Sequence, residues 1–142
     1  MKYLLDTNVV SEPLRPKPDE RVLARLRVHE GEIALPSPVW HELHFGCVRL
    51  PRSRRRRSIE RYLSDIVASS FPILDYDRVA AEWHAGERAR LTAKGKTPSF
   101  VDGQIAGIAA INDLVLVTFN HRDFEVFEEL ELEDWRANGA RS

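Results

Sequence analysis

The sequence has one cysteine, one methionine and no long uninterrupted apolar run, and each of these absences excludes a class of protein. Cys47 alone cannot form an internal disulfide, so the fold depends on a buried apolar core and suits a reducing cytoplasm. The most apolar stretch, residues 100–118, is interrupted by acids and amides, which excludes a membrane-spanning helix. The N-terminus reaches Asp6 after three apolar residues, too few for a signal peptide. With 142 residues, 43% of them hydrophobic, we expect one domain over residues 1–142, in the cytoplasm and without membrane contact.

The net charge of −1 conceals two oppositely charged segments. Residues 46–64 hold seven arginines and one acid, a local charge of +6, whereas residues 124–142 hold six acids and two arginines, a local charge of −4. Because binding responds to local potential, the near-zero sum does not exclude a polyanionic partner. The run from Arg52 to Arg57 is open to two interpretations, a solvated loop or a contact to phosphate or to a protein partner.

Short apolar runs alternate with segments of helical spacing along the whole chain. Strands are expected at residues 2–6, 32–35, 71–74 and 114–118. Helices are expected from Asn8 to about Pro13, after an N-cap at Asp19, and at residues 37–50, 58–69, 77–94 and 99–111. This alternation predicts an α/β domain with a mostly parallel sheet, in which ligands bind at the carboxyl ends of the strands.

Three carboxylates occupy positions where an acid is costly to bury. Asp6 directly follows the first strand, and Glu42 and Asp102 each share a helical face with apolar residues three and four positions away. Each has a structural alternative: a helix cap for Asp6, the edge of the apolar face for Glu42, and a helix-dipole contact for Asp102. With Asn120 and Asp123 after the last strand, they predict acids from three elements converging on one sheet edge. Carboxylate oxygens without thiolates suit Mg²⁺ or Mn²⁺.

Other catalytic motifs find little support in the sequence. The His-Glu-Leu-His run at residues 41–44 spaces its histidines three apart, whereas the zinc-protease motif needs four. There is no serine-hydrolase elbow, phosphate-binding loop or dinucleotide fingerprint. A haloacid-dehalogenase-like phosphatase would need an aspartate where Asn8 stands. We expect His29, His84 and His121 at the surface or in loops.

Four parts of the chain together resemble the PIN-domain nucleases, and in particular the VapC and FitB-like toxins of bacterial toxin-antitoxin pairs. They are residues 4–12, Glu42 in its helix, residues 101–106 and residues 116–124. The resemblance implies a three-layer α/β/α sandwich and an endoribonuclease that depends on Mg²⁺, with Mn²⁺ as an alternative. It also implies a homodimer inhibited by a cognate antitoxin, and contact with operator DNA only through that antitoxin.

The resemblance also implies roles for individual residues. Asp6 and Asp102 would be metal ligands, Glu42 a ligand or water-orienting acid, and Asn120 with Asp123 the variable fourth corner of the catalytic set. The expected substrate contacts are Thr7, Asn8 and Thr118 beside the acids, and Arg54, Arg55 and Arg56 in the arginine run.

Two positions depart from the pattern of the family. Asn120 stands where many relatives have the fourth acid, and Phe119 stands where a basic or polar residue is common, which removes one phosphate contact. These departures leave room for a second function, a PIN-like binding protein that acts with its antitoxin on operator DNA and cleaves little. A binding module would have no need to keep Asp6, Glu42 and Asp102 together. The target RNA is left open between transfer RNA and ribosomal RNA loops.

Overall fold

A five-stranded sheet in the order β3-β2-β1-β4-β5, with every neighbouring pair parallel, forms the centre of the computed structural model, which describes residues 1–136. The central strands are apolar along their whole length because helices cover both faces of the sheet. The strands are β1 (Tyr3–Leu5), β2 (Ile33–Pro36), β3 (Ile73–Leu74), β4 (Val115–Val117) and β5 (Leu132–Glu133).

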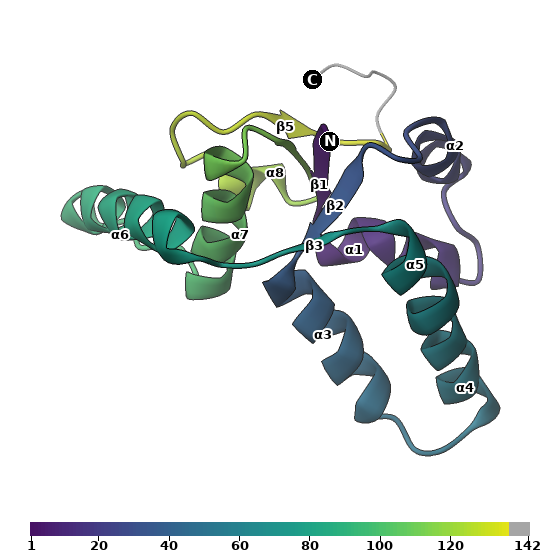
Figure 1. Ribbon diagram of the computed structural model, residues 1–142. Coiled ribbons are helices and arrows are strands. Elements are labelled where there is room, and N and C mark those ends of the chain that lie inside the picture. The colour runs from purple at the N-terminus through teal and green to yellow at the C-terminus, as the bar shows by residue number, and fades with distance from the viewer. Residues whose placement is uncertain (137–142) are drawn as a thin grey trace.

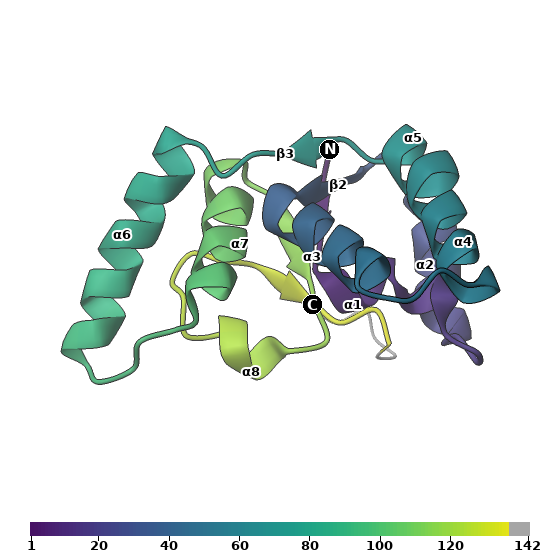
Figure 2. The same cartoon turned by 90° about the horizontal axis from the view of Figure 1, so that it is seen from below.

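Helices cover the sheet on two sides, as Figures 1 and 2 show from two directions. Helices α6 and α7 lie on one side, and α1, α2, α4 and α5 lie on the other. The three-layer α/β/α architecture expected from the sequence is thereby confirmed. The helices are α1 (Thr7–Val10), α2 (Glu20–Val28), α3 (Ser37–Val48), α4 (Arg54–Arg61), α5 (Ala68–Ser70), α6 (Arg78–Ala93), α7 (Phe100–Ile111) and α8 (His121–Phe124), with a 3₁₀ turn η1 (Glu12–Leu14) and a π-helical turn η2 (Tyr62–Val67).

Capping residues in the sequence predicted where several of the helices begin or end. Asp19 accepts a hydrogen bond from the Arg21 amide and caps α2, and Ser99 accepts one from the Asp102 amide and caps α7. Side-chain oxygens at these positions satisfy donors that the first turn of a helix leaves free. Gly95, with φ +75°, follows the end of α6, as expected.

Two helices and one strand differ from those expected from the sequence. The helix expected at residues 58–69 begins at Arg54, because Ser53 Oγ accepts a hydrogen bond from the Arg56 amide and caps it there. Arg54 to Arg57 therefore lie on a helix and not in a loop, whereas Arg52 precedes the helix. All of them except Arg56 are exposed to solvent, and a contact to phosphate or to a protein partner stays a prediction. The short elements α8 and β5 were not expected, since β5 is two residues long and forms through its pairing with β4.

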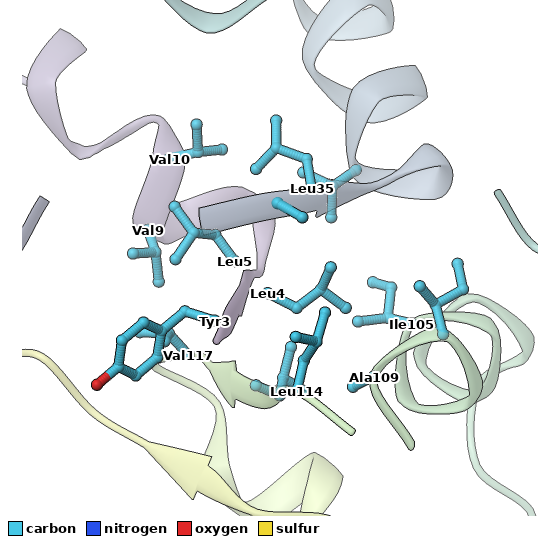
Figure 3. Packing of buried hydrophobic residues seen from close by; sticks show 14 of the residues in the cluster. Tyr3, Leu4, Leu5, Val9, Val10, Leu35, Ile105, Ala109, Leu114 and Val117 are labelled. Carbon is cyan, nitrogen blue, oxygen red and sulfur yellow. The ribbon is translucent and has the colours of Figure 1, made fainter. Parts of the chain in front are cut away.

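The buried core fixes the strand that leads to the acids. Figure 3 shows Leu4 of β1 on the side of Ile105 and Ala109 of α7, and Leu5 on the opposite side, near Val9 and Val10 of α1. Both leucines are fully buried. Burying one such leucine stabilises the fold by about 1.5–3 kcal/mol. On the other side of the sheet the Tyr62 hydroxyl donates to the Val10 carbonyl at 2.6 Å, and burial raises the pKa of Tyr62 to about 12. The segment after β1 is thus held from both sides.

Candidate active site

Asp6 lies at the junction of β1, β4 and α1, where its carboxylate is held by two hydrogen bonds. Its Oδ1 accepts from the Thr7 amide at 2.9 Å, and its Oδ2 accepts from the Thr118 hydroxyl at 2.8 Å. The Asp6 amide also donates to the Val117 carbonyl at 3.0 Å, which extends the pairing of β1 with β4. Only 8% of the residue is exposed. Burial raises the pKa of Asp6, the two hydrogen bonds oppose this, and the charge of Asp123 raises the pKa further.

Asp102 lies in the first turn of α7, where the Ser99 cap holds its backbone at 3.1 Å. Burial is the main cause that raises the pKa of Asp102, and the charges of Asp6 and Asp123 raise it as well, against a lowering hydrogen bond from Ser99. Three of the predicted acids, from three different elements, therefore lie within electrostatic range of one another. The charge of Asp123 raises the pKa of both Asp6 and Asp102, and the charge of Asp6 raises that of Asp102, a repulsion that a bound cation would relieve.

Glu42 is exposed, so the expectation that it shares the apolar face of α3 is wrong. The buried side chains of that helix are Val39, Leu43 and Cys47, and Glu42 points away from them into solvent. It lines a cleft of about 330 Å³ between α3 and α7, opposite Gln104. Glu42 thus faces the first turns of α7 across a cleft, without being packed against the buried acids.

Thr118 has a structural part in the site, which corrects the expectation that it contacts substrate. It is fully buried, its hydroxyl donates to Asp6, and its oxygen accepts a hydrogen bond from the Asn120 amide at 3.0 Å. Thr7 is half-buried and Asn8 exposed at the start of α1, and Asn120 and Asp123 are exposed around α8. The roles of these four residues stay predictions.

The arginine run divides into structural and free side chains. Arg56 Nε donates to Glu60 at 3.0 Å, and its Nη1 donates to the carbonyls of Val48 and Leu50 at 3.3 and 3.0 Å, at the end of α3. Arg56 therefore caps the C-terminal end of α3, and its role as a substrate contact stays a prediction. Arg54 and Arg55 are exposed on α4, which lies across α3 from α7 in both views (Figures 1 and 2).

His84 is 1% exposed, so its expected place at the surface is wrong. It lies on the buried face of α6 with Ala80 and Leu91, and this spacing of four and seven residues is a helical signal that the sequence contains. Its Nδ1 shares a hydrogen bond with the Tyr76 hydroxyl at 2.8 Å, and within residues 1–136 its Nε2 has no partner.

Glu12 is a second buried polar residue, and its role was not predicted from the sequence. Its residue is 2% exposed, its Oε2 accepts from the Asp19 amide at 2.7 Å, and its Oε1 pairs with Arg15 at 3.5 Å. It ties the turn after α1 to the start of α2. Nothing in the local pattern distinguishes this acid from an exposed one, because its partner lies seven residues away.

The donor chemistry of the site discriminates between metals. Within residues 1–136 no three histidine, cysteine, aspartate or glutamate side chains lie close enough to hold a metal ion by themselves. A catalytic zinc requires three protein ligands and does not fit. Mg²⁺ binds through one or two carboxylates, with water and a substrate phosphate as the remaining ligands, and fits Asp6 and Asp102.

The chain matches the family model of the PIN domain over residues 3–130. It belongs to the PIN-domain family. The resemblance found in the sequence is confirmed, and it holds over most of the described chain.

Similar proteins match this chain over nearly its full length. The chain is 34% identical to the tRNA(fMet)-specific endonuclease VapC of Shigella flexneri, over 95% of this chain and 98% of that protein. The structure of FitAB bound to an IR36 DNA fragment superposes with a TM-score of 0.90 at 26% identity, covering 99% of both chains. DNA-bound VapBC of Salmonella typhimurium superposes with a TM-score of 0.83 at 30% identity, covering 95% and 98%. Within residues 1–136 no helix has both the length and the apolar character to cross a membrane.

Proposed function

We propose that this PIN-domain protein is a Mg²⁺-dependent endoribonuclease and the toxin of a type II toxin-antitoxin pair. The observation that supports it is the grouping of Asp6, Asp102 and Asp123 at one sheet edge, with the pKa of both Asp6 and Asp102 raised by burial and by like charges. Two similar proteins of nearly the same length, from Shigella flexneri and Haemophilus influenzae, are named as an endonuclease and a ribonuclease.

The chain supplies rigid, anionic groups to the reaction. Thr7 and Thr118 hold the two oxygens of Asp6, and Ser99 holds the first turn of α7 that carries Asp102. A bound Mg²⁺ would neutralise these acids, polarise a phosphoryl oxygen and lower the pKa of a bound water. Asp6 and Asp102 would hold the cation, and Asp123 and Glu42 would orient water. Hydrolysis would leave a 5′-phosphate and a 3′-hydroxyl.

The alternative of a binding module with little nuclease activity is not favoured. Such a module has no use for a buried Asp6 and a half-buried Asp102 that repel one another, because their burial costs stability and serves no contact. The names of the relatives also favour a nuclease over a binding module, since they describe nucleases and toxins.

The proposal extends to partners and location. Structures similar to this chain include VapBC and FitAB complexes with DNA, and we propose that this protein is inhibited by an antitoxin that also contacts operator DNA. Phe45 and Val48 on α3 are more than half exposed, which supports a homodimer formed through that helix. The RNA substrate and the single buried cysteine suit the cytoplasm.

The test is RNA cleavage by the purified protein and by a matched pair of variants. Asp102→Asn removes one carboxylate of the site, and Asp113→Asn makes the same change to an exposed acid just beyond the other end of α7. Asp113 has φ 56°, a conformation that asparagine adopts readily, so the control should fold normally. We expect cleavage to fall by about 100-fold or more for Asp102→Asn, because it loses a charge that binds the cation, and to stay unchanged for Asp113→Asn.

The substrates should be transfer RNA, as the name of the Shigella flexneri relative suggests, and total RNA with mapped ends. Cleavage should require Mg²⁺ or Mn²⁺ and stop with EDTA. A folded Asp102→Asn variant with full activity, or cleavage that continues in EDTA, would contradict the proposal.

A further inference from the structure

A groove of about 470 Å³ lies next to the segments that carry Asp6 and Asp123. It lies between the α1–η1 segment and the loop after β4. Its lining includes two arginines, Arg15 and Arg136, and one acid, Glu12, together with Asn8, Phe119 and Asn120. Two of these residues connect it directly to Asp6. Asn8 is two positions further along the chain, and the Asn120 amide donates to the Thr118 hydroxyl oxygen, which in turn donates to Asp6. A ligand in the groove would therefore lie next to a ligand at the acids.

Arg136 is fixed over the groove by contacts on one side of its guanidinium. Its Nε and Nη2 donate to the two carboxylate oxygens of Asp134 at 3.1 and 2.8 Å, and Nη2 also donates to the Phe119 carbonyl at 3.3 Å. The guanidinium carbon lies 4.2 Å from the centre of the Phe119 ring. Within residues 1–136 Nη1 makes no hydrogen bond, so two N–H groups are available to a ligand, and 44% of the side chain is exposed.

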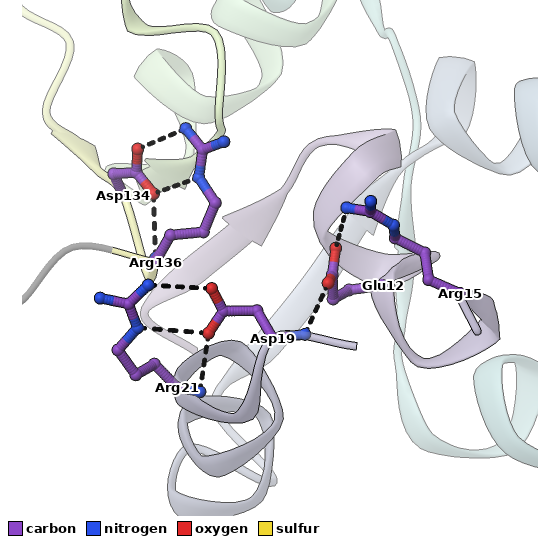
Figure 4. A network of polar contacts seen from close by, with 6 residues as sticks. All are labelled: Glu12, Arg15, Asp19, Arg21, Asp134 and Arg136. Carbon is purple, nitrogen blue, oxygen red and sulfur yellow. Dashed lines mark hydrogen bonds and ion pairs between the residues drawn. The ribbon is translucent and has the colours of Figure 1, made fainter. Parts of the chain in front are cut away.

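Neighbouring ion pairs hold the surrounding side chains, as Figure 4 shows. Arg15 pairs with the buried Glu12, and its side chain is 66% exposed. Arg21 pairs with Asp19 at 3.0 Å and does not line the groove. The acids orient the arginines and leave outward N–H groups free, so binding an anion would cost little side-chain entropy.

Phe119 itself offers no charge to a phosphate. The structure provides the charge from a different segment, because Arg136, which follows β5, lies against the Phe119 ring. Consecutive phosphates of a nucleic acid are one nucleotide apart. A strand with one phosphate at Asp6 and Asp102 must place a neighbouring phosphate close by, and this groove offers a fixed guanidinium there.

We propose that the groove is a subsite for a backbone phosphate of single-stranded RNA adjacent to the phosphate that is cleaved. Arg136 is the main contact, through Nη1, and Arg15 is the second. This inference rests on the proposed endoribonuclease function and adds a specific binding subsite to it. A charge-assisted hydrogen bond from Arg136 Nη1 to a phosphate oxygen would hold the strand in position before cleavage.

The test compares three substitutions in the full chain, each made in an Asp102→Asn background so that the RNA stays intact. Arg136→Gln removes the charge, Arg136→Lys keeps it, and Arg21→Gln removes one charge from the same network outside the groove. The dissociation constant for a short single-stranded RNA is measured with Mg²⁺ over a range of salt concentrations. One lost phosphate contact reduces the salt dependence of binding to a single strand by about 0.7 in the log-log slope.

We expect Arg136→Gln to weaken binding about tenfold and to reduce the slope by about 0.7, because a charge-assisted contact is lost. Arg136→Lys should keep the slope, and Arg21→Gln should bind like the parent protein. Equal affinity and slope for Arg136→Gln and the parent would overturn the subsite. So would an equal loss in all three variants accompanied by lower thermal stability, which would indicate a structural role.

Two further outcomes separate this inference from the proposed function. If the protein without the Asp102 substitution cleaves RNA and Arg136→Gln cleaves it with the same KM, the subsite alone is overturned. If Arg136→Gln binds RNA normally but binds the antitoxin more weakly, the groove belongs to a protein partner and the inference is wrong. A protein that neither binds nor cleaves RNA would overturn both.

Discussion

Gly103, next to Asp102, lies directly against the buried imidazole of His84. A methyl group on Gly103 would overlap the ring, whose own position is fixed by the Tyr76 hydroxyl at 2.8 Å. Burial lowers the pKa of His84, with a smaller lowering by Arg88, so the ring is favoured in its neutral form. The absence of a side chain at Gly103 thus allows α6 and α7 to approach each other next to the carboxylate of Asp102.

Gly103→Ala should therefore destabilise the protein by about 1–3 kcal/mol, because the core cannot accommodate the added methyl without a shift of α7. Gly86→Ala, in α6 with no atom near its added methyl, is the matched control and should stabilise by about 0.5–1 kcal/mol. Urea unfolding measures both. The pair Gly103→Ala and His84→Ala should cost less than the sum of the single changes, because removing the ring relieves the overlap. Strictly additive effects would show that the two residues do not interact.

Helix ends determine where most of the site side chains lie. Asp6 caps α1, Ser99 caps α7, and the C-terminal end of α3 is closed by a side chain from the next helix, Arg56. Carbonyl groups at a helix C-terminus lack partners within the helix, and the Arg56 guanidinium binds that of Val48 together with that of Leu50 just beyond the helix. The arginine run therefore has one member that holds α3 against α4, while its neighbours remain in solvent.

Arg56→Gln and Arg55→Gln make the same change one position apart on α4 and should differ in effect. We expect Arg56→Gln to lower the free energy of unfolding by about 1–2 kcal/mol, because the carbonyls of Val48 and Leu50 lose a charged donor. Arg55→Gln should change it by less than about 0.5 kcal/mol, as is usual at an exposed position. Chemical denaturation of both variants gives the comparison. Equal stabilities would contradict the capping role of Arg56.

At the scale of the whole molecule, the parallel sheet brings together groups that are far apart in the chain. Asp6 and Thr118 are hydrogen-bonded across 112 positions, because β1 and β4 are neighbours that end at the same edge. That edge collects carboxylates, and their burial opposes folding as long as no cation is bound. The stability of the protein should therefore respond to both pH and divalent cations.

The Asp6→Asn variant isolates this effect. In the wild type the raised pKa means that the folded state binds the Asp6 proton more tightly than the unfolded state. Its contribution to stability falls as pH rises from the ordinary pKa of 3.8 through the raised pKa, and Asp6→Asn should lack this loss. We expect the variant to be more stable than wild type at pH 7 without divalent cations, whereas Asp113→Asn should follow wild type. Thermal unfolding across pH measures the difference, and a variant less stable than wild type at pH 7 would contradict it.

Comparing the wild type with Asp6→Asn also tests whether the cation binds at Asp6. Mg²⁺ at 100 times its dissociation constant should stabilise the wild type by about 2.7 kcal/mol, and it should stabilise Asp6→Asn less. An equal response of the two proteins would place the cation elsewhere.

The sequence by itself determined the α/β class, the family, the caps at Asp19 and Ser99, and the positions of Asp6 and Asp102 at element ends. These features depend on short-range patterns, because apolar spacing and capping act within a few residues. Only the tertiary structure decided that Glu42 is exposed, that His84 is buried, and that Arg136 lies on Phe119. Each of these depends on which surfaces of distant segments meet, and packing between helices and strands settles that at a range that local patterns do not reach.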